Sequence, residues 1–194
     1  MIVLVPDNTM KRAFEKLLER HDQLQIRRFS FEIYAHKGRD PGVYRTCQEF
    51  LRPVNRNYGF ALVVFDREGC GAERKAAELL EREVENRLAR NGWHSRCAAI
   101  VIDPELEAWV WQDSEIVARR LRLSRSVLRS LLGKTGKPRR PKETLEAALR
   151  SKGIARSAAF YQKLAESADF GNCKDRAFNK FLRTLQTWFP LVGV

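Results

Sequence analysis

Two pairs of acidic residues stand out because each pair follows a run of apolar residues. Asp66 and Glu68 follow the run at 60–65, and Glu105 and Glu107 follow a later apolar run. An uninterrupted β-prone run predicts a strand buried on both faces, and parallel α/β sheets present functional groups at the carboxyl ends of their strands. We therefore expect both pairs at one sheet edge. The alternative for the first pair is a polar turn that ends the strand, since Asp and Gly are common in turns.

Carboxylates gathered at such an edge are suited to bind Mg²⁺ or Mn²⁺, which prefer oxygen ligands. In this hypothesis Asp66 and Glu68 bind the metal, and Glu105 and Glu107 complete or support the site. Asp7, which follows the first apolar segment, is a candidate for acid/base work. With a phosphate present, such a metal can activate water and stabilise the leaving oxygen. The competing explanations are favourable placement of Glu105 at a helix N-terminus and a solvated helix face for Glu107.

Other charged residues near these pairs have simpler explanations. Arg67 and Arg74 could neutralise the acids through ion pairs, which would prevent metal binding. Asp103 precedes Pro104 in a turn that ends the strand, so we leave it outside the predicted site.

The segments that would position the acids alternate between strand and helix patterns through residue 112. We expect strands at 2–5, 24–29, 60–65 and 93–102, and helices at 10–19, 43–51 and 72–90. Residues 31–34 alternate in polarity and either continue the second strand or pair with it. This order predicts an α/β fold with a mostly parallel sheet flanked by helices.

Beyond residue 112 the patterns are helical only. We expect helices at 115–121, 124–132, 141–152, 157–168 and 175–189. The sequence thus divides into an α/β domain over 1–112 and a helical, basic C-terminal subdomain over 113–194 that packs on it. The apolar positions of these helices are explained by a core.

The net charge of +12 is concentrated in the C-terminal part. Residues 1–112 carry 18 basic and 17 acidic residues, whereas 113–194 carry 18 and 7, a net charge of +11. This asymmetry favours nucleic acid as a partner, although a basic surface can also maintain solubility or bind an acidic protein. The residues expected to contact phosphates lie in the loop at 133–142: Lys134, Lys137, Arg139 and Arg140.

Two basic segments have features of phosphate sites. Gly133-Lys134-Thr135 lacks the earlier glycine of a P-loop and follows a helix rather than a strand, so we reject that function. The segment at 36–42 offers Lys37 and Arg39 as phosphate contacts, but a solvated loop explains the same residues.

Several classes of protein are disfavoured by the sequence. No apolar run approaches the roughly 18–20 residues of a membrane span. The start of the chain lacks the basic region of a signal peptide, so we expect a cytoplasmic protein with no membrane partner. The four cysteines are widely spaced, which disfavours a zinc site or a disulfide framework.

Three segments carry a resemblance to a known family. They are the first strand with the acid after it, Val63-Val64-Phe65-Asp66-Arg67-Glu68, and Pro104-Glu105-Leu106-Glu107-Ala108-Trp109. Together they resemble Toprim-like proteins, and more narrowly the DUF4276-type proteins often found in bacterial phage-defence gene clusters. The start of the helix at Pro141-Lys142, Tyr161 and the segment at 176–181 resemble the C-terminal half of that family.

The resemblance implies a Toprim-like, Rossmann-like sheet with a Mg²⁺ site for phosphodiester chemistry. Asp66 and Glu68 match the metal-binding D-x-D pair, and Glu105 and Glu107 match the E-x-E element. The expected function is therefore a Mg²⁺-dependent nuclease-like protein of an anti-phage system. This chain has Pro6-Asp7 where such proteins usually carry a glutamate. The alternative is thus a catalytically degenerate adaptor or nucleic-acid-binding subunit of a defence complex with protein partners.

Overall fold

A parallel four-stranded sheet forms the centre of the computed structural model, which describes residues 1–132, 134, 136–171 and 173–191. In spatial order its strands are β2 (Glu32–Ala35), β1 (Ile2–Val5), β3 (Ala61–Asp66) and β4 (Cys97–Ile102). Each strand is parallel to its neighbours. The predicted α/β class with a parallel sheet flanked by helices is confirmed.

Both faces of the sheet are buried because successive strand residues point to opposite faces. In β1, Val3 and Val5 contribute to one apolar cluster and Ile2 and Leu4 to the other. β3 and β4 alternate in the same way, which explains why their sequences are continuously apolar.

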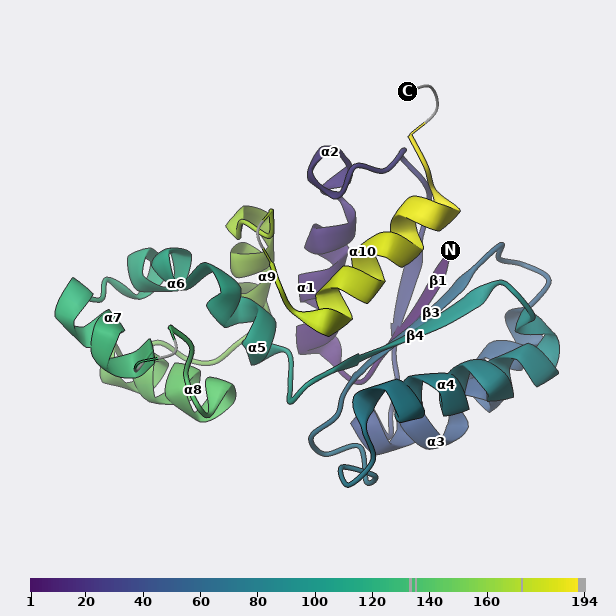
Figure 1. Cartoon of the computed structure of the whole chain (residues 1–194), viewed down its shortest axis with the longest axis horizontal. Helices are drawn as coiled ribbons and strands as arrows, with labels where there is room; N and C mark the ends of the chain where they lie inside the picture. The colour runs from purple at the N-terminus through teal and green to yellow at the C-terminus, as the bar shows by residue number, and fades with distance from the viewer. Residues whose placement is uncertain (133, 135, 172, 192–194) are drawn as a thin grey trace.

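Each face is covered by two helices, as Figure 1 shows. α1 (Asn8–Leu18) and α10 (Arg176–Trp188) cover one face, and α3 (Arg39–Leu51) and α4 (Ala77–Leu88) cover the other. The final helix of the chain thus returns to the sheet, although it follows the helical segment in sequence. The buried Phe178, Phe181 and Leu185 of α10 confirm that its apolar stripe belongs to the core.

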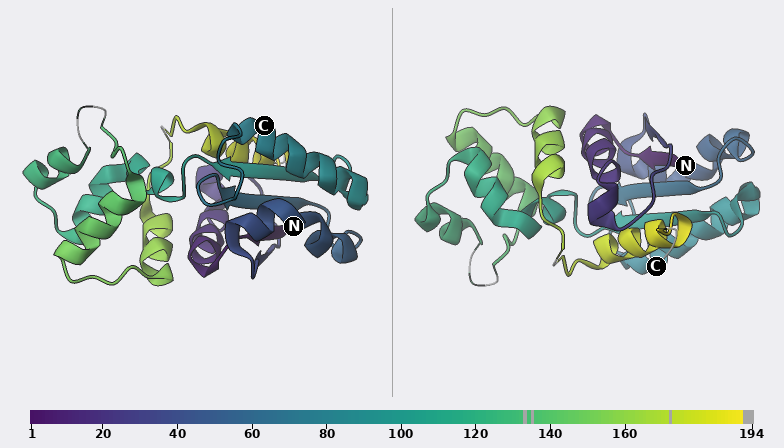
Figure 2. Two further views of the ribbon diagram at one scale, coloured as in Figure 1. Left: turned by 90° about the horizontal axis from the view of Figure 1, so that it is seen from below. Right: turned by 90° about the horizontal axis from the view of Figure 1, so that it is seen from above.

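The helices between β4 and α10 form a separate group beside the sheet (Figure 2), which we call the helical part. Its members are α5 (Glu107–Val110), α6 (Ser114–Leu121), α7 (Arg125–Leu132), α8 (Pro141–Ser151) and α9 (Ala158–Ser167). α9 packs along α1 and so joins the helical part to the sheet. Short 3₁₀ turns cover Arg52–Val54 and Trp111–Asp113.

The outer edge of β4 is closed by side chains rather than by another strand. The backbone N–H groups of Ala99 and Val101 donate to Glu85 Oε1 at 3.0 Å and to Glu81 Oε1 at 2.9 Å. Arg176 donates to the Val101 carbonyl at 3.1 Å and also pairs with the buried Glu81. These contacts satisfy the strand edge that would otherwise be open to pairing.

Two predictions about the first 60 residues are wrong. Residues 24–29 do not form a strand: α2 (His21–Leu24) ends there, and β2 lies further along the chain. The apolar residues of this segment serve irregular packing instead, since Ile26 is buried and Phe29 stacks on Phe189 with ring centroids 3.8 Å apart. The helix expected at 43–51 begins four residues earlier, so Arg39 and Asp40 are helical rather than in a loop.

Within the described residues, no helix is long and apolar enough to span a membrane.

Candidate metal and phosphate site

The two segments that carry the acidic pairs lie side by side at the carboxyl edge of the sheet. Asp66 is in register with Ile102, the last residue of β4. Beyond the strands, the Arg67 and Glu68 N–H groups donate to the Ile102 and Pro104 carbonyls at 2.8 and 2.9 Å. The backbone pairing therefore continues past the sheet and holds the segments that carry the acids together.

Asp66 has an unusual environment at the end of β3. Its Oδ1 atom is buried and accepts no hydrogen bond from any residue in the described part of the chain. Burial raises the pKa of this carboxyl well above its ordinary value, and the negative charges of Asp40 and Glu107 raise it further. A buried carboxylate oxygen without a donor is costly for the fold, so a ligand that compensates it would be favourable.

Asp40 is a neighbouring acid that the sequence prediction missed. It stands in the first turn of α3, and its Oδ1 atom accepts a hydrogen bond from the Asp66 backbone N–H at 2.8 Å. Burial raises the pKa of Asp40, and the charge of Asp7 adds to this effect. The Asp40-Pro41 pair was a usable signal, since acids and proline are favoured in the first turn of a helix.

Glu105 is held against the start of α8. Its Oε1 atom accepts from the Lys142 backbone N–H at 3.0 Å, and its Oε2 atom lies 3.6 Å from the Lys142 ammonium. Burial and the charge of Glu107 raise the pKa of Glu105. Burial opposes the charge of Lys142, but Glu105 and Glu107 outweigh this and raise the Lys142 pKa. Glu105 and Lys142 thus connect the sheet edge to the helical part.

Glu107 has partners of its own away from this edge. It is only 2% exposed, and its Oε1 atom accepts hydrogen bonds from the Tyr161 hydroxyl and, at 3.0 Å, from Arg156 Nη2. Burial and the Glu107 charge raise the pKa of Tyr161, so its hydroxyl keeps the proton that it donates. Glu107 therefore anchors α5 to α9, through Tyr161, and to the segment before it, through Arg156.

Asp7 likewise has a local structural contact. Its Oδ1 atom accepts from the Met10 N–H at 2.9 Å and caps the N-terminus of α1. Of the two arginines that could neutralise the acids, Arg67 pairs with Asp103 instead, with its Nε 2.8 Å from Asp103 Oδ1.

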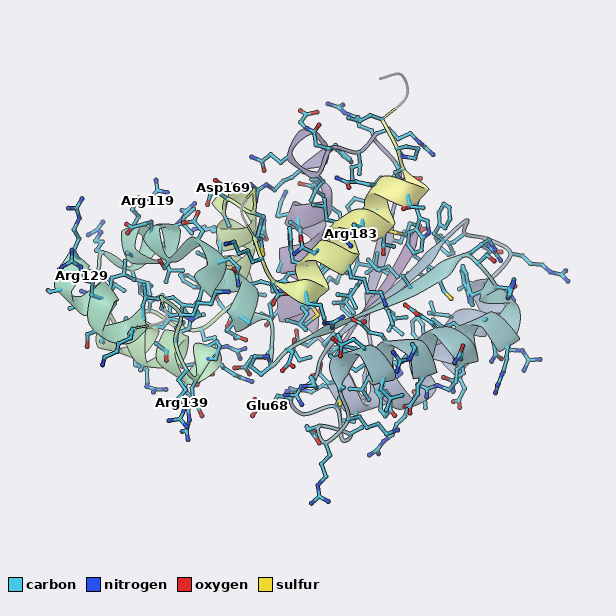
Figure 3. All side chains as sticks on the ribbon, viewed as in Figure 1. Glu68, Arg119, Arg129, Arg139, Asp169 and Arg183 are labelled. Carbon is cyan, nitrogen blue, oxygen red and sulfur yellow. The ribbon has the colours of Figure 1, made fainter. Side chains whose placement is uncertain are left out.

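The acids face a cleft of about 890 Å³ between the sheet edge and α8. Its acidic lining residues at the sheet edge are Asp40, Asp66, Glu68 and Glu105. The rest of the lining comprises Arg39, Pro41, Gly69, Pro104, Arg139, Arg140, Pro141, Lys142, Glu143 and Glu146. Figure 3 shows Glu68 and Arg139 on the two parts of the molecule that border this cleft.

The predicted phosphate contacts divide into two groups. Arg39, Arg139 and Arg140 line the cleft, whereas Lys37 and Lys134 are exposed outside its lining. Lys137 is also exposed and outside the lining. Gly133 and Thr135, which belong to the rejected P-loop motif, lie outside the described residues. The structure thus brings basic residues far apart in sequence to the same cleft as the acids.

The metal-binding capacity of this edge depends on few protein ligands. Across residues 1–132, 134, 136–171 and 173–191, no group of three His, Cys, Asp or Glu side chains is arranged to hold a metal. Mg²⁺ is commonly bound through only one or two carboxylates, with waters and substrate phosphates as its other ligands. Asp40, Asp66 and Glu68 line the same cleft and are the residues that could hold such an ion.

Comparisons with models of protein families, with curated proteins and with solved structures found no match to this chain.

Proposed function

We propose that this protein cleaves phosphodiester bonds of nucleic acid with Mg²⁺ or Mn²⁺. The observation that carries the proposal is the buried Asp66 Oδ1 atom, for which the described chain offers no hydrogen-bond donor. Asp66 lines a cleft that also presents arginine and lysine side chains. An acidic metal position next to cationic phosphate contacts is the arrangement that phosphodiester chemistry needs.

Each part of the cleft has a defined task in this proposal. Asp66 would bind the metal together with Asp40 or Glu68. The bound ion would supply an activated water and charge stabilisation. Arg139 and Arg140 would bind the substrate backbone from the helical part, because guanidinium groups match the geometry of phosphate oxygens.

Glu105 and Lys142 would act between the metal position at Asp66 and the phosphate contacts at Arg139 and Arg140. The raised pKa of Glu105 makes its carboxylate a better proton acceptor than an exposed glutamate. The Lys142 ammonium, 3.6 Å from Glu105 Oε2, would neutralise charge near the phosphate. Glu107 would contribute by fixing α5 rather than by contact with substrate.

The sequence resemblance supports a Toprim-like version of this chemistry in an anti-phage system. The second candidate is a degenerate member that binds nucleic acid or partner proteins without chemistry. Two observations favour it. Asp7 caps α1, and the Glu105 carboxylate is already engaged by Lys142.

Cleavage assays distinguish these functions. Labelled single-stranded and duplex DNA and RNA are incubated with the wild-type protein in Mg²⁺, Mn²⁺ or EDTA. The variants Asp66→Asn, at the metal position, and Arg139→Ala, at a phosphate contact, are assayed in the same way. The nuclease proposal predicts cleavage that requires metal, is lost in Asp66→Asn and is weakened in Arg139→Ala. Binding without metal-dependent cleavage of any substrate would instead support the adaptor.

A further inference from the structure

Two aromatic side chains form an exposed patch at the β2 edge of the sheet. Tyr34 of β2 is 40% exposed and Phe50 of α3 is 38% exposed, and their ring centroids are 5.9 Å apart. His36 extends the patch, with its ring 6.0 Å from that of Phe50. Large apolar side chains this exposed are few in the described chain, and these two come from different elements and contact each other. We call Tyr34, Phe50 and His36 the aromatic patch.

The patch is not part of the core. The inward face of α3 is formed by Val43, Cys47 and Leu51, which are buried against the sheet. Tyr34 lies on the outermost strand, whose other edge has no strand partner in the described chain. Both rings are therefore partly open to solvent at this edge of the sheet.

The chain leads directly from this patch to the cleft. β2 ends at Ala35, and the next residues include Lys37 and then Arg39, which lines the cleft. The connecting turn is fixed by His36, whose Nδ1 atom accepts from the Gly38 N–H at 3.0 Å. The carboxylate of Glu32, at the start of β2, accepts from the Tyr34 hydroxyl at 2.7 Å, on the side of that ring away from Lys37 in the sequence. Positive charge thus lies between the aromatic rings and the cleft.

We propose that Tyr34 and Phe50 stack with bases of single-stranded nucleic acid whose backbone passes Lys37 and Arg39 into the cleft. Exposed aromatic rings beside a basic track are the recognised means of binding single strands without sequence preference. A duplex does not offer its base faces to such rings, so the surface selects unpaired substrate. That the nucleic-acid strand leads into the cleft rests on the proposed function. Its binding to the aromatic patch requires neither metal nor cleavage.

Fluorescence anisotropy in EDTA tests this surface separately from catalysis. The probes are labelled oligothymidine, labelled oligouridine and a duplex of equal length. The double variant Tyr34→Leu/Phe50→Leu keeps apolar bulk but removes the flat rings, and Tyr34→Phe/Phe50→Tyr keeps both rings. Leu79→Ala, which truncates a comparably exposed side chain on α4, is the control for general surface change.

We expect the leucine variant to bind the single strands about tenfold or more weakly, as loss of base stacking predicts. The ring-preserving variant and Leu79→Ala should bind as the wild type does, and the duplex should be the weaker ligand throughout. Wild-type affinity in the leucine variant, or equal affinity for the duplex, would overturn the proposal. So would a change from dimer to monomer in sedimentation of the leucine variant, because the patch would then be a surface for a second copy.

Discussion

Replacement of Asp66 with asparagine should stabilise the metal-free protein at neutral pH. The Oδ1 atom of the wild-type carboxylate is buried and has no donor among the described residues, and the acids Asp40 and Glu105 lie nearby. These features raise the pKa of Asp66 in the folded state above the unfolded value of about 3.9. Folding therefore favours the protonated form, and ionisation at neutral pH costs free energy.

The sign of the pH dependence follows from this shift. Because the folded pKa is the higher one, the contribution of Asp66 to stability is fully present below about pH 4 and is lost as the pH rises through the folded pKa. Each unit of difference between the two pKa values corresponds to about 1.4 kcal/mol. Asparagine keeps the shape of the side chain but cannot ionise, so its advantage should grow as the pH increases.

The size of the effect is set by the cost of ionising the group at this position, about 1.4 kcal/mol for each unit between the two pKa values, because asparagine still places a polar atom at the Oδ1 position. For a chain of this length, 1 kcal/mol changes the melting temperature by roughly 2–4 °C. Thermal unfolding of Asp66→Asn and wild type in EDTA should therefore show a higher Tm for the variant at pH 7.5 and a much smaller difference at pH 4. Glu68→Gln, in the same cleft but exposed, should differ from wild type by less than about 0.5 kcal/mol.

A Tm for Asp66→Asn below that of wild type at pH 7.5 would refute the reasoning. It would show that the Asp66 carboxylate is compensated within the metal-free fold. A gain that is equal at both pH values would also contradict the account, because it would not arise from ionisation.

Three further predictions concern the other predicted site residues. Glu107→Gln should reduce the free energy of unfolding in urea by about 1.5–3 kcal/mol, since the hydrogen bonds from Arg156 and Tyr161 would no longer end on a charged group; an unchanged midpoint would contradict this anchoring role. Asp7→Ala should cost about 1 kcal/mol through loss of the α1 cap but retain cleavage, and loss of cleavage at full stability would make Asp7 a catalytic residue instead. Arg139→Ala combined with Arg140→Ala should reduce the slope of log K against log salt by about two for a nucleic-acid probe, whereas an unchanged slope would place the phosphate contacts elsewhere.

Much of the architecture could be predicted from local sequence. β1 has the predicted bounds, and β3 and β4 lie within one residue or inside the predicted segments, because strands buried on both faces are continuously apolar. β2 was misplaced since it is a short edge strand, while the more apolar segment before it packs irregularly. A run of apolar residues indicates that a segment is buried, but it does not distinguish a strand from an irregular buried segment.

The candidate site was harder to predict because it depends on contacts between distant segments. Asp40 reaches Asp66 across 26 positions, so its place at the sheet edge follows from how α3 packs and not from its own neighbours. Glu107 could be read as a solvated helix residue, yet its hydroxyl partner Tyr161 is 54 positions away. The approach of Lys142 to Glu105 likewise depends on where the helical part packs.

Metal titration tests the central claim most directly, because it needs no substrate. Isothermal titration of Mn²⁺ or Mg²⁺ into the wild-type protein, Asp66→Asn and Glu68→Gln measures whether the carboxyl edge of the sheet binds a divalent cation. We expect saturable binding by wild type and loss of binding in Asp66→Asn. Glu68→Gln should still bind the ion, with an affinity equal to or below that of wild type. Equal binding by wild type and Asp66→Asn, or no binding by wild type, would contradict a metal site at Asp66.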